Sequence, residues 1–158
     1  MTARMRAGLA LMGLLLGGSA VAEAQARTTY FGPRVLYNFD AESFGIGVGL
    51  TAPIQSGFSF YPSFDYYFLD LGTSFQINAD VKYQFPNEDL QWLYVAAGVG
   101  ISRFSYEGFS STDAGLNLVG GFQPAGAARI KPFVEAKLGI GDGSYFQVAG
   151  GINIPLGR

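Results

Sequence analysis

Hydrophobic and polar residues alternate strictly from Ser74 to Phe85, where the chain reads SFQINADVKYQF. A period of two predicts a β-strand with one apolar face and one polar face. The polar row includes Asp80 and Lys82. The direction in which this row points therefore determines whether the protein folds in water or in a membrane.

The same alternation recurs in eight segments, each long enough to cross a bilayer as a tilted strand of about 9 to 11 residues. Gly, Pro, Asp and Ser dominate the connections, which are too short for crossover helices, so neighbouring strands are expected to be antiparallel. The pattern predicts an all-β fold, an eight-stranded antiparallel up-and-down transmembrane β-barrel with short turns. The segments are Phe31 to Phe39, Phe44 to Ala52, Phe58 to Leu69, Ser74 to Phe85, Gln91 to Arg103, Gly115 to Gln123, Ile130 to Ile140 and Tyr145 to Leu156.

One face of these segments is bulky, apolar and uncharged. Such a face suits lipid, and aromatic rings near strand ends are typical of the two membrane interfaces. We therefore expect the following aromatic side chains to face lipid: Phe44, Phe58, Phe60, Phe68, Phe75, Tyr83, Phe85, Phe122 and Phe146.

The opposite face is rich in small and polar residues, and it also carries Trp92 and Tyr94. The interior of an eight-stranded barrel has room for small or mutually paired side chains. We expect this face to fill the lumen, either as a plug in which inward charges neutralise one another or as an ion-paired gate on a narrow polar path. Its charged residues are Arg34, Asp65, Asp80, Lys82, Lys131, Glu135 and Lys137.

A soluble barrel accepts the same alternation with the opposite facing. In a lipocalin-like periplasmic barrel, the Phe-rich face would line a cavity for an apolar ligand and the charges would face water. The bulk of the apolar face favours the membrane, and the alternative remains open at this point.

The N-terminus has the layout of a secretory signal peptide. Arg4 and Arg6 precede an apolar run, and small residues follow it. This layout predicts a signal peptide over residues 1–24, with cleavage near Ala24 or Ala26, and a barrel domain over residues 25–158. A net charge of −2 gives no electrostatic reason to expect nucleic acid as a partner.

The chain contains no His and no Cys. A His-based general base, a Ser-His-Asp triad and His or Cys metal sites therefore cannot be built. No short motif points to other catalytic chemistry, so we expect no enzyme activity, no cofactor and no metal.

The signal peptide, the eight two-faced segments and the closing stretch KPFVEAKLGIGDGSYFQVAGGINIPLG together resemble the small outer-membrane β-barrel superfamily of Gram-negative bacteria. That superfamily is typified by the transmembrane domain of outer-membrane protein A and by opacity-type porin-like proteins. The resemblance implies a monomer in the bacterial outer membrane, in contact with its lipids and lipopolysaccharide and folded by the outer-membrane assembly machinery. Gly151, Ile154 and Leu156 match the C-terminal pattern that this machinery reads, whereas Ala149 stands at its polar position.

Within that superfamily the expected role is structural, in envelope integrity, or that of a minor small-solute path. Surface adhesion is a further alternative, and its seat would be the longest connection, the expected loop from Ser105 to Ala114. The candidate residues there are Tyr106, Glu107, Phe109 and Asp113.

Overall fold

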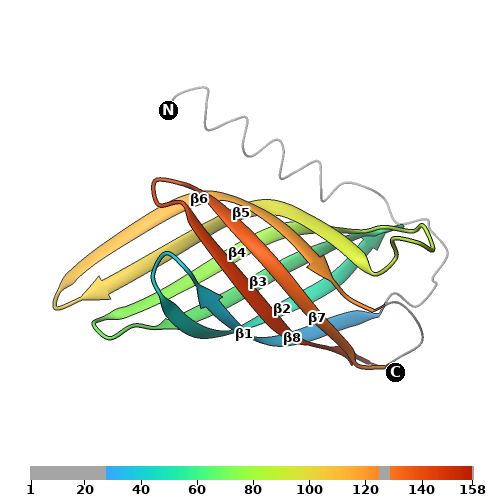
Figure 1. The fold of residues 1–158 in the computed structure, drawn as a ribbon, viewed down its shortest axis with the longest axis horizontal. Coiled ribbons are helices and arrows are strands. Elements are labelled where there is room, and N and C mark those ends of the chain that lie inside the picture. Colours follow the sequence, from blue (N-terminus) through green and yellow to red (C-terminus); the bar gives the residue numbers. More distant parts are fainter. Residues whose placement is uncertain (1–27, 125–128, 158) are drawn as a thin grey trace.

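The computed structural model describes residues 28–124 and 129–157, so the predicted signal peptide lies outside the described residues. Within them, no helix is long and apolar enough to cross a membrane. Figure 1 shows a barrel of eight strands, which are β1 (Thr29–Asn38), β2 (Ser43–Gln55), β3 (Phe58–Phe68), β4 (Thr73–Gln84), β5 (Leu93–Tyr106), β6 (Phe109–Phe122), β7 (Lys131–Gly141) and β8 (Tyr145–Leu156).

Each strand pairs with the next in antiparallel register, and β1 also pairs with β8, which closes the sheet. The predicted fold class is therefore confirmed. The turns β1–β2, β3–β4, β5–β6 and β7–β8 lie at one end of the barrel, called the outer end here (Figure 1). The β2–β3 and β4–β5 turns, the end of β6, the start of β7, the start of β1 and the end of β8 lie at the opposite, inner end.

The β5–β6 connection differs most from the expectation. The predicted loop from Ser105 to Ala114 is wrong, because β5 and β6 continue through it to a register pair of Tyr106 and Phe109. Glu107 and Gly108 alone make the turn, with φ of 42° and 83°. Positive φ at both central residues is the geometry of a type I′ hairpin. The alternation does not predict this part of the two strands. Outside a membrane both faces of a strand meet water, so polar and apolar residues no longer alternate.

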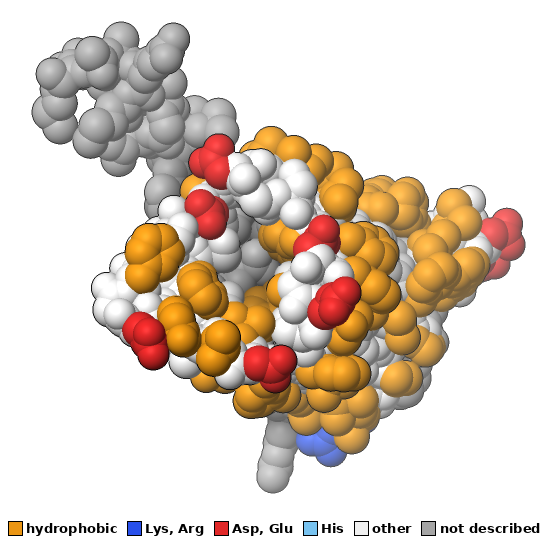
Figure 2. Space-filling view, turned by 60° about the vertical axis from the view of Figure 1, so that its left-hand side comes forward, with side chains coloured by type: hydrophobic (Ala, Val, Ile, Leu, Met, Phe, Trp, Pro, Cys, Tyr) orange, Lys and Arg blue, Asp and Glu red, His pale blue; other side chains and the backbone are white. Residues whose placement is uncertain are grey.

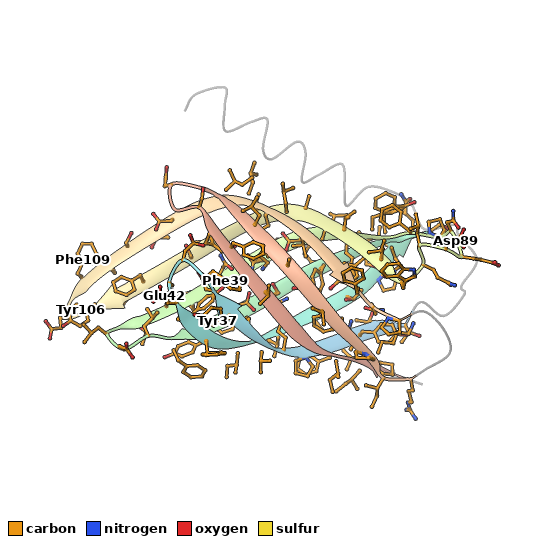
Figure 3. The ribbon with its side chains drawn as sticks, viewed as in Figure 1. Tyr37, Phe39, Glu42, Asp89, Tyr106 and Phe109 are labelled. Atoms are coloured by element: carbon orange, nitrogen blue, oxygen red, sulfur yellow. The ribbon has the colours of Figure 1, made fainter. Side chains whose placement is uncertain are left out.

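The outer surface of the barrel is apolar (Figures 2 and 3). Phe75, Tyr83 and Phe85 are half-buried, because their rings pack on aromatic neighbours on the same surface. The lipocalin-like alternative is excluded, because the Phe-rich face lies outside. The other expected lipid-facing aromatics are exposed, namely Phe44, Phe58, Phe60, Phe68, Phe122 and Phe146.

The alternation predicted that Trp92 faces the lumen, and this prediction is wrong. Its side chain is 42% exposed and stacks on Phe122, with ring centres 5.0 Å apart. Its Nε1 donates to the carbonyl oxygen of Asp89 at 2.7 Å. Trp92 precedes the first residue of β5, so the two-residue period of a strand does not set its direction.

Candidate functional site in the barrel interior

Six side chains of Arg, Lys, Asp and Glu in the described part of the chain are buried inside the barrel, three basic and three acidic. Each is at most 3% exposed: Arg34, Lys82 and Lys137, with Asp65, Asp80 and Glu135. The seventh predicted charge, Lys131, is half-buried at the inner end, where its Nζ lies 5.3 Å from the centre of the Tyr30 ring. The buried charges are therefore balanced in number.

Arg34 is the centre of this interior. It projects from β1, and its Nε and Nη2 donate to Asp65 of β3 at 2.8 and 2.7 Å. Its Nη1 donates to Oε1 of Glu135, on β7, at 2.8 Å. All three side chains have 0% or 1% of their surface exposed. One guanidinium thus joins two carboxylates from distant parts of the sequence across the lumen.

Glu135 also accepts hydrogen bonds from two tyrosines. The hydroxyls of Tyr61 and Tyr94 donate to its Oε2 at 2.9 and 2.8 Å. Tyr61 was not among the residues expected in the lumen. It lies two residues from both Ser59 and Ser63 in the same strand, and this spacing alone predicts that it faces the lumen with them.

Lys82 interacts with rings instead of a carboxylate. Its Nζ lies 3.8 Å from the centre of the Tyr94 ring and 5.2 Å from that of Tyr61, distances at which a cation is attracted to a π face. Nζ also donates to Oε1 of Gln123 at 3.2 Å. Oε1 of Gln123 accepts in turn from Asn153 at 2.8 Å.

The remaining two charges have weaker partners. Nζ of Lys137 lies 3.6 Å from Oδ2 of Asp65. Oδ1 of Asp80 accepts from Asn117 at 2.9 Å, while Oδ2 of Asp80 and Nζ of Lys137 have no hydrogen bond. Among the ion pairs of the described residues, none joins Asp80 to Lys82 or Glu135 to Lys137. Residues two apart along a strand are separated by about 6.6 Å, so these charged side chains find closer partners on other strands across the lumen.

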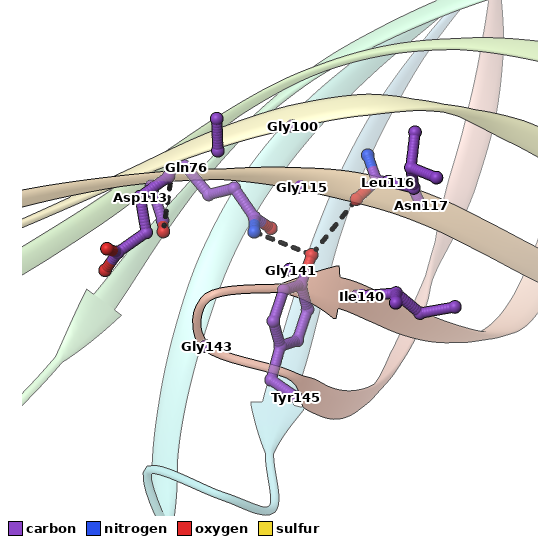
Figure 4. Close-up of a pocket in the computed structure, with 13 residues that line it drawn as sticks. Gln76, Gly100, Asp113, Gly115, Leu116, Asn117, Ile140, Gly141, Gly143 and Tyr145 are labelled. Atoms are coloured by element: carbon purple, nitrogen blue, oxygen red, sulfur yellow. Dashed lines mark hydrogen bonds between the residues drawn. The ribbon is translucent and has the colours of Figure 1, made fainter.

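Neutral side chains close the interior toward the outer end. The hydroxyl of Tyr67 donates to Oε1 of Gln147 at 2.5 Å. In Figure 4, Nε2 of Gln76 donates to the Tyr145 hydroxyl at 2.6 Å, and this hydroxyl donates to Oδ1 of Asn117 at 3.3 Å. The cavity beside this chain of hydrogen bonds has a volume of about 20 Å³, which is room for a single water molecule.

The candidate outer-loop residues lie on the β5–β6 hairpin, apart from the charged interior. Tyr106 and Phe109 lie at its tip (Figure 3), and the Phe109 side chain is 65% exposed. Glu107 is in the turn, and Asp113 lies lower on β6, half-buried. No group of three or more His, Cys, Asp or Glu side chains in residues 28–124 and 129–157 could hold a metal ion.

Comparisons with known proteins give likeness in fold without likeness in sequence. No family model and no curated protein matches the sequence. The N-terminal β-barrel domain of OprF from Pseudomonas aeruginosa superposes with a TM-score of 0.66 at 12% identity, covering 82% of this chain and 98% of that one. Neisserial surface protein A superposes with a TM-score of 0.58 at 13% identity, covering 82% and 95%. This chain therefore shares the closed β-barrel fold of these two proteins, and its apolar exterior and charged interior are arranged as in transmembrane β-barrels.

Proposed function

We propose that this protein is a closed, non-enzymatic barrel whose role in the outer membrane is structural, in envelope integrity. The observation that carries the proposal is the bridge from Arg34 to both Asp65 and Glu135 across the lumen. A charge-balanced interior held by such bonds favours a plug over a path for solutes.

The alternative within the same class is a minor small-solute path. It would require Arg34 to leave a carboxylate and Tyr61 and Tyr94 to leave Glu135. Separating a buried, hydrogen-bonded ion pair without a replacement costs about 3 to 5 kcal/mol. A lumen that opens at this cost is closed nearly all the time.

Glu135→Gln tests the plug. It keeps the side-chain volume but leaves one buried positive charge in excess, and we expect the free energy of unfolding to fall by about 3 to 5 kcal/mol. Urea unfolding in detergent micelles, followed by the fluorescence of the single Trp, measures this. Glu88→Gln, in the exposed β4–β5 turn, is the matched control and should leave stability unchanged.

Planar-bilayer recordings complete the test. The unmodified protein should show no resolved conductance steps at neutral pH. Regular steps from the unmodified protein, together with unchanged stability of Glu135→Gln, would establish the solute path and reject the plug. A deletion strain should admit bulky antibiotics that the parent strain excludes, and the unmodified gene should restore exclusion.

Surface attachment is a second candidate, and the protruding β5–β6 hairpin is the observation that favours it. Its exposed Phe109 gives an apolar contact at the tip. Attachment of protein-coated beads to host-cell surfaces would test this, with Phe109→Ser as the variant. Equal attachment by the variant and the unmodified barrel would remove the hairpin tip as a binding element.

We further propose that the barrel is monomeric, contacts lipid and lipopolysaccharide, and is inserted by the outer-membrane assembly machinery. The apolar outer surface of the barrel supports the contact with lipid. The match of Gly151, Ile154 and Leu156 to the C-terminal signal supports insertion by the assembly machinery. Depletion of that machinery should leave the protein unfolded in the periplasm and open to proteolysis. Folding at normal yield without it would contradict this partner.

A further inference from the structure

The outer end of the interior opens into a vestibule of about 380 Å³ above Tyr67, Gln76 and Tyr145. Small-molecule sites in proteins commonly have volumes of about 300 to 1,000 Å³. Gln76 and Tyr145, which line the vestibule, are joined by a hydrogen bond, and the Tyr145 hydroxyl bonds Asn117 of the interior (Figure 4). The lining also includes Asp40, Ala41 and Ser144 of the outer-end turns, so the vestibule opens at the outer end.

The lining of the vestibule is polar and aromatic, and all but one of its described residues are uncharged. Amides and hydroxyls come from Asn38, Gln76 and Ser74, and rings come from Tyr67 and Phe104. Side-chain amides and hydroxyls bond sugar hydroxyls, and ring faces pack against the apolar C–H faces of a sugar. This combination of groups suits a hydroxyl-rich ring that carries no charge.

Charge at the vestibule favours a neutral ligand. Among the described residues that line it, Asp40 alone is charged, and its Oδ2 already accepts from the backbone N–H of Phe146 at 2.6 Å. Acidic side chains are also spaced around the outer end (Figure 2). An anion would be repelled there, and a cation would find no free carboxylate oxygen pair within the lining.

Unused hydrogen-bonding capacity lies at the vestibule floor. Oγ of Ser43, which lines the vestibule, is buried and has no hydrogen-bond partner. Buried polar groups in folded proteins are nearly always paired, so this hydroxyl is available to a ligand or to water.

We propose that this vestibule binds a neutral hexose unit. Two sources share that chemistry, namely free oligosaccharide in the medium and the glycan chain of lipopolysaccharide in the same leaflet. The inference is independent of the structural role proposed above, because the vestibule and the charged plug are built from different side chains.

Maltose is the probe for the free source. Isothermal titration should be carried out in a detergent without a sugar headgroup, such as an amine oxide, since a maltoside would compete. We expect saturable binding of maltose and none of gluconate, which carries a carboxylate. Equal binding of both, or of neither when lipopolysaccharide also fails to bind, would overturn the proposal.

Two variants place the binding in the vestibule. Ser43→Ala removes a hydroxyl that has no partner in the free protein, so affinity should fall several-fold while the unfolding midpoint stays unchanged. Ser74→Phe fills the vestibule and should lower affinity at least tenfold, whereas Ser110→Phe, exposed on the hairpin, should not change it. Maltose affinity unaffected by both vestibule variants would place the sugar elsewhere and reject the site.

The lipopolysaccharide arm uses vesicles that contain lipopolysaccharide with or without its glycan chain. Stronger association with the glycan-bearing form, lost in Ser74→Phe, identifies the membrane source. Binding of maltose with no preference between the two vesicles identifies free oligosaccharide.

Discussion

Tyr94 and Gly121 show how single residues set the usable volume of the interior. They are register partners on β5 and β6, and a Cβ added to Gly121 would meet the Tyr94 ring. Gly47 has the same relation to Asp65, because an added Cβ there would meet the carboxylate. Large polar side chains fit inside eight strands where a neighbouring strand supplies a residue without a side chain.

Gly121→Ala is therefore expected to destabilise the barrel by about 1 to 3 kcal/mol, because the methyl group displaces the Tyr94 ring from its contact with Glu135. Gly120→Ala is the matched control, since an added Cβ on this outward-facing neighbour has nothing within 4 Å. Urea unfolding of both variants in micelles gives the difference. Equal stability of the two variants would mean that interior volume is not limiting at Tyr94.

At the scale of elements, β6 consists of two parts. From Gly115 to Phe122 it pairs with both β5 and β7, whereas from Phe109 to Ala114 it pairs, among the described strands, with β5 alone. Along this outer part β6 is an edge strand, whereas β5 beside it still pairs with β4 as far as Ser105.

Shortening the β5–β6 hairpin by two residues in each strand keeps the facing of the residues that remain. We expect the free energy of unfolding to fall by no more than about 1 kcal/mol, because the shortened hairpin still ends beyond the charged interior and only Thr73, at the start of β4, loses its partner on β5. Heat-modifiable gel migration and urea unfolding check this. The deleted residues are Phe104, Ser105, Ser110 and Ser111.

An equal deletion lower on the same two strands is the control, and it should abolish folding because each lost pair has neighbours on both sides. That deletion removes Val99, Gly100, Gly115 and Leu116. If the hairpin deletion were as damaging as the control, the outer part of the hairpin would be essential to the stable barrel.

The strands themselves were predictable from alternation because a bilayer on one side and a polar lumen on the other act on every second residue. The predicted strand bounds differ from the observed ones where lipid and lumen no longer face opposite sides of the strand, as at Trp92 and along Phe109 to Ala114. The inward direction of Arg34 and Glu135 also followed from parity. Their contact did not, because two side chains that are 101 residues apart meet according to strand tilt and register.

At the scale of the whole molecule, the polarity of a soluble protein is inverted. Large apolar side chains are exposed around the barrel, Leu118 at 49% and Leu138 at 43% among them, while balanced charges lie inside. Such a surface is stable only against hydrocarbon, since in water it would be an aggregation site.

Leu118→Lys places a cation midway along the part of β6 that has neighbours on both sides, and we expect it to cost about 2 to 4 kcal/mol in lipid vesicles. Phe109→Lys, at the hairpin tip, should leave stability within about 0.5 kcal/mol. Unfolding titrations of the vesicle-inserted variants measure both. A similar cost at the two positions would contradict the placement of the bilayer around the barrel body.

The bridge from Arg34 to Glu135 also bears on the order of folding. Arg34 lies on the first strand and Glu135 on the seventh, so most of the chain must be in place before their contact can form. Contacts between residues far apart in sequence are slow to form, because the entropy of closing the intervening loop is lost first. An incompletely closed sheet holds unpaired charges, which the surrounding hydrocarbon disfavours strongly. We therefore expect partly inserted intermediates to be sparsely populated and the barrel to close in one cooperative step.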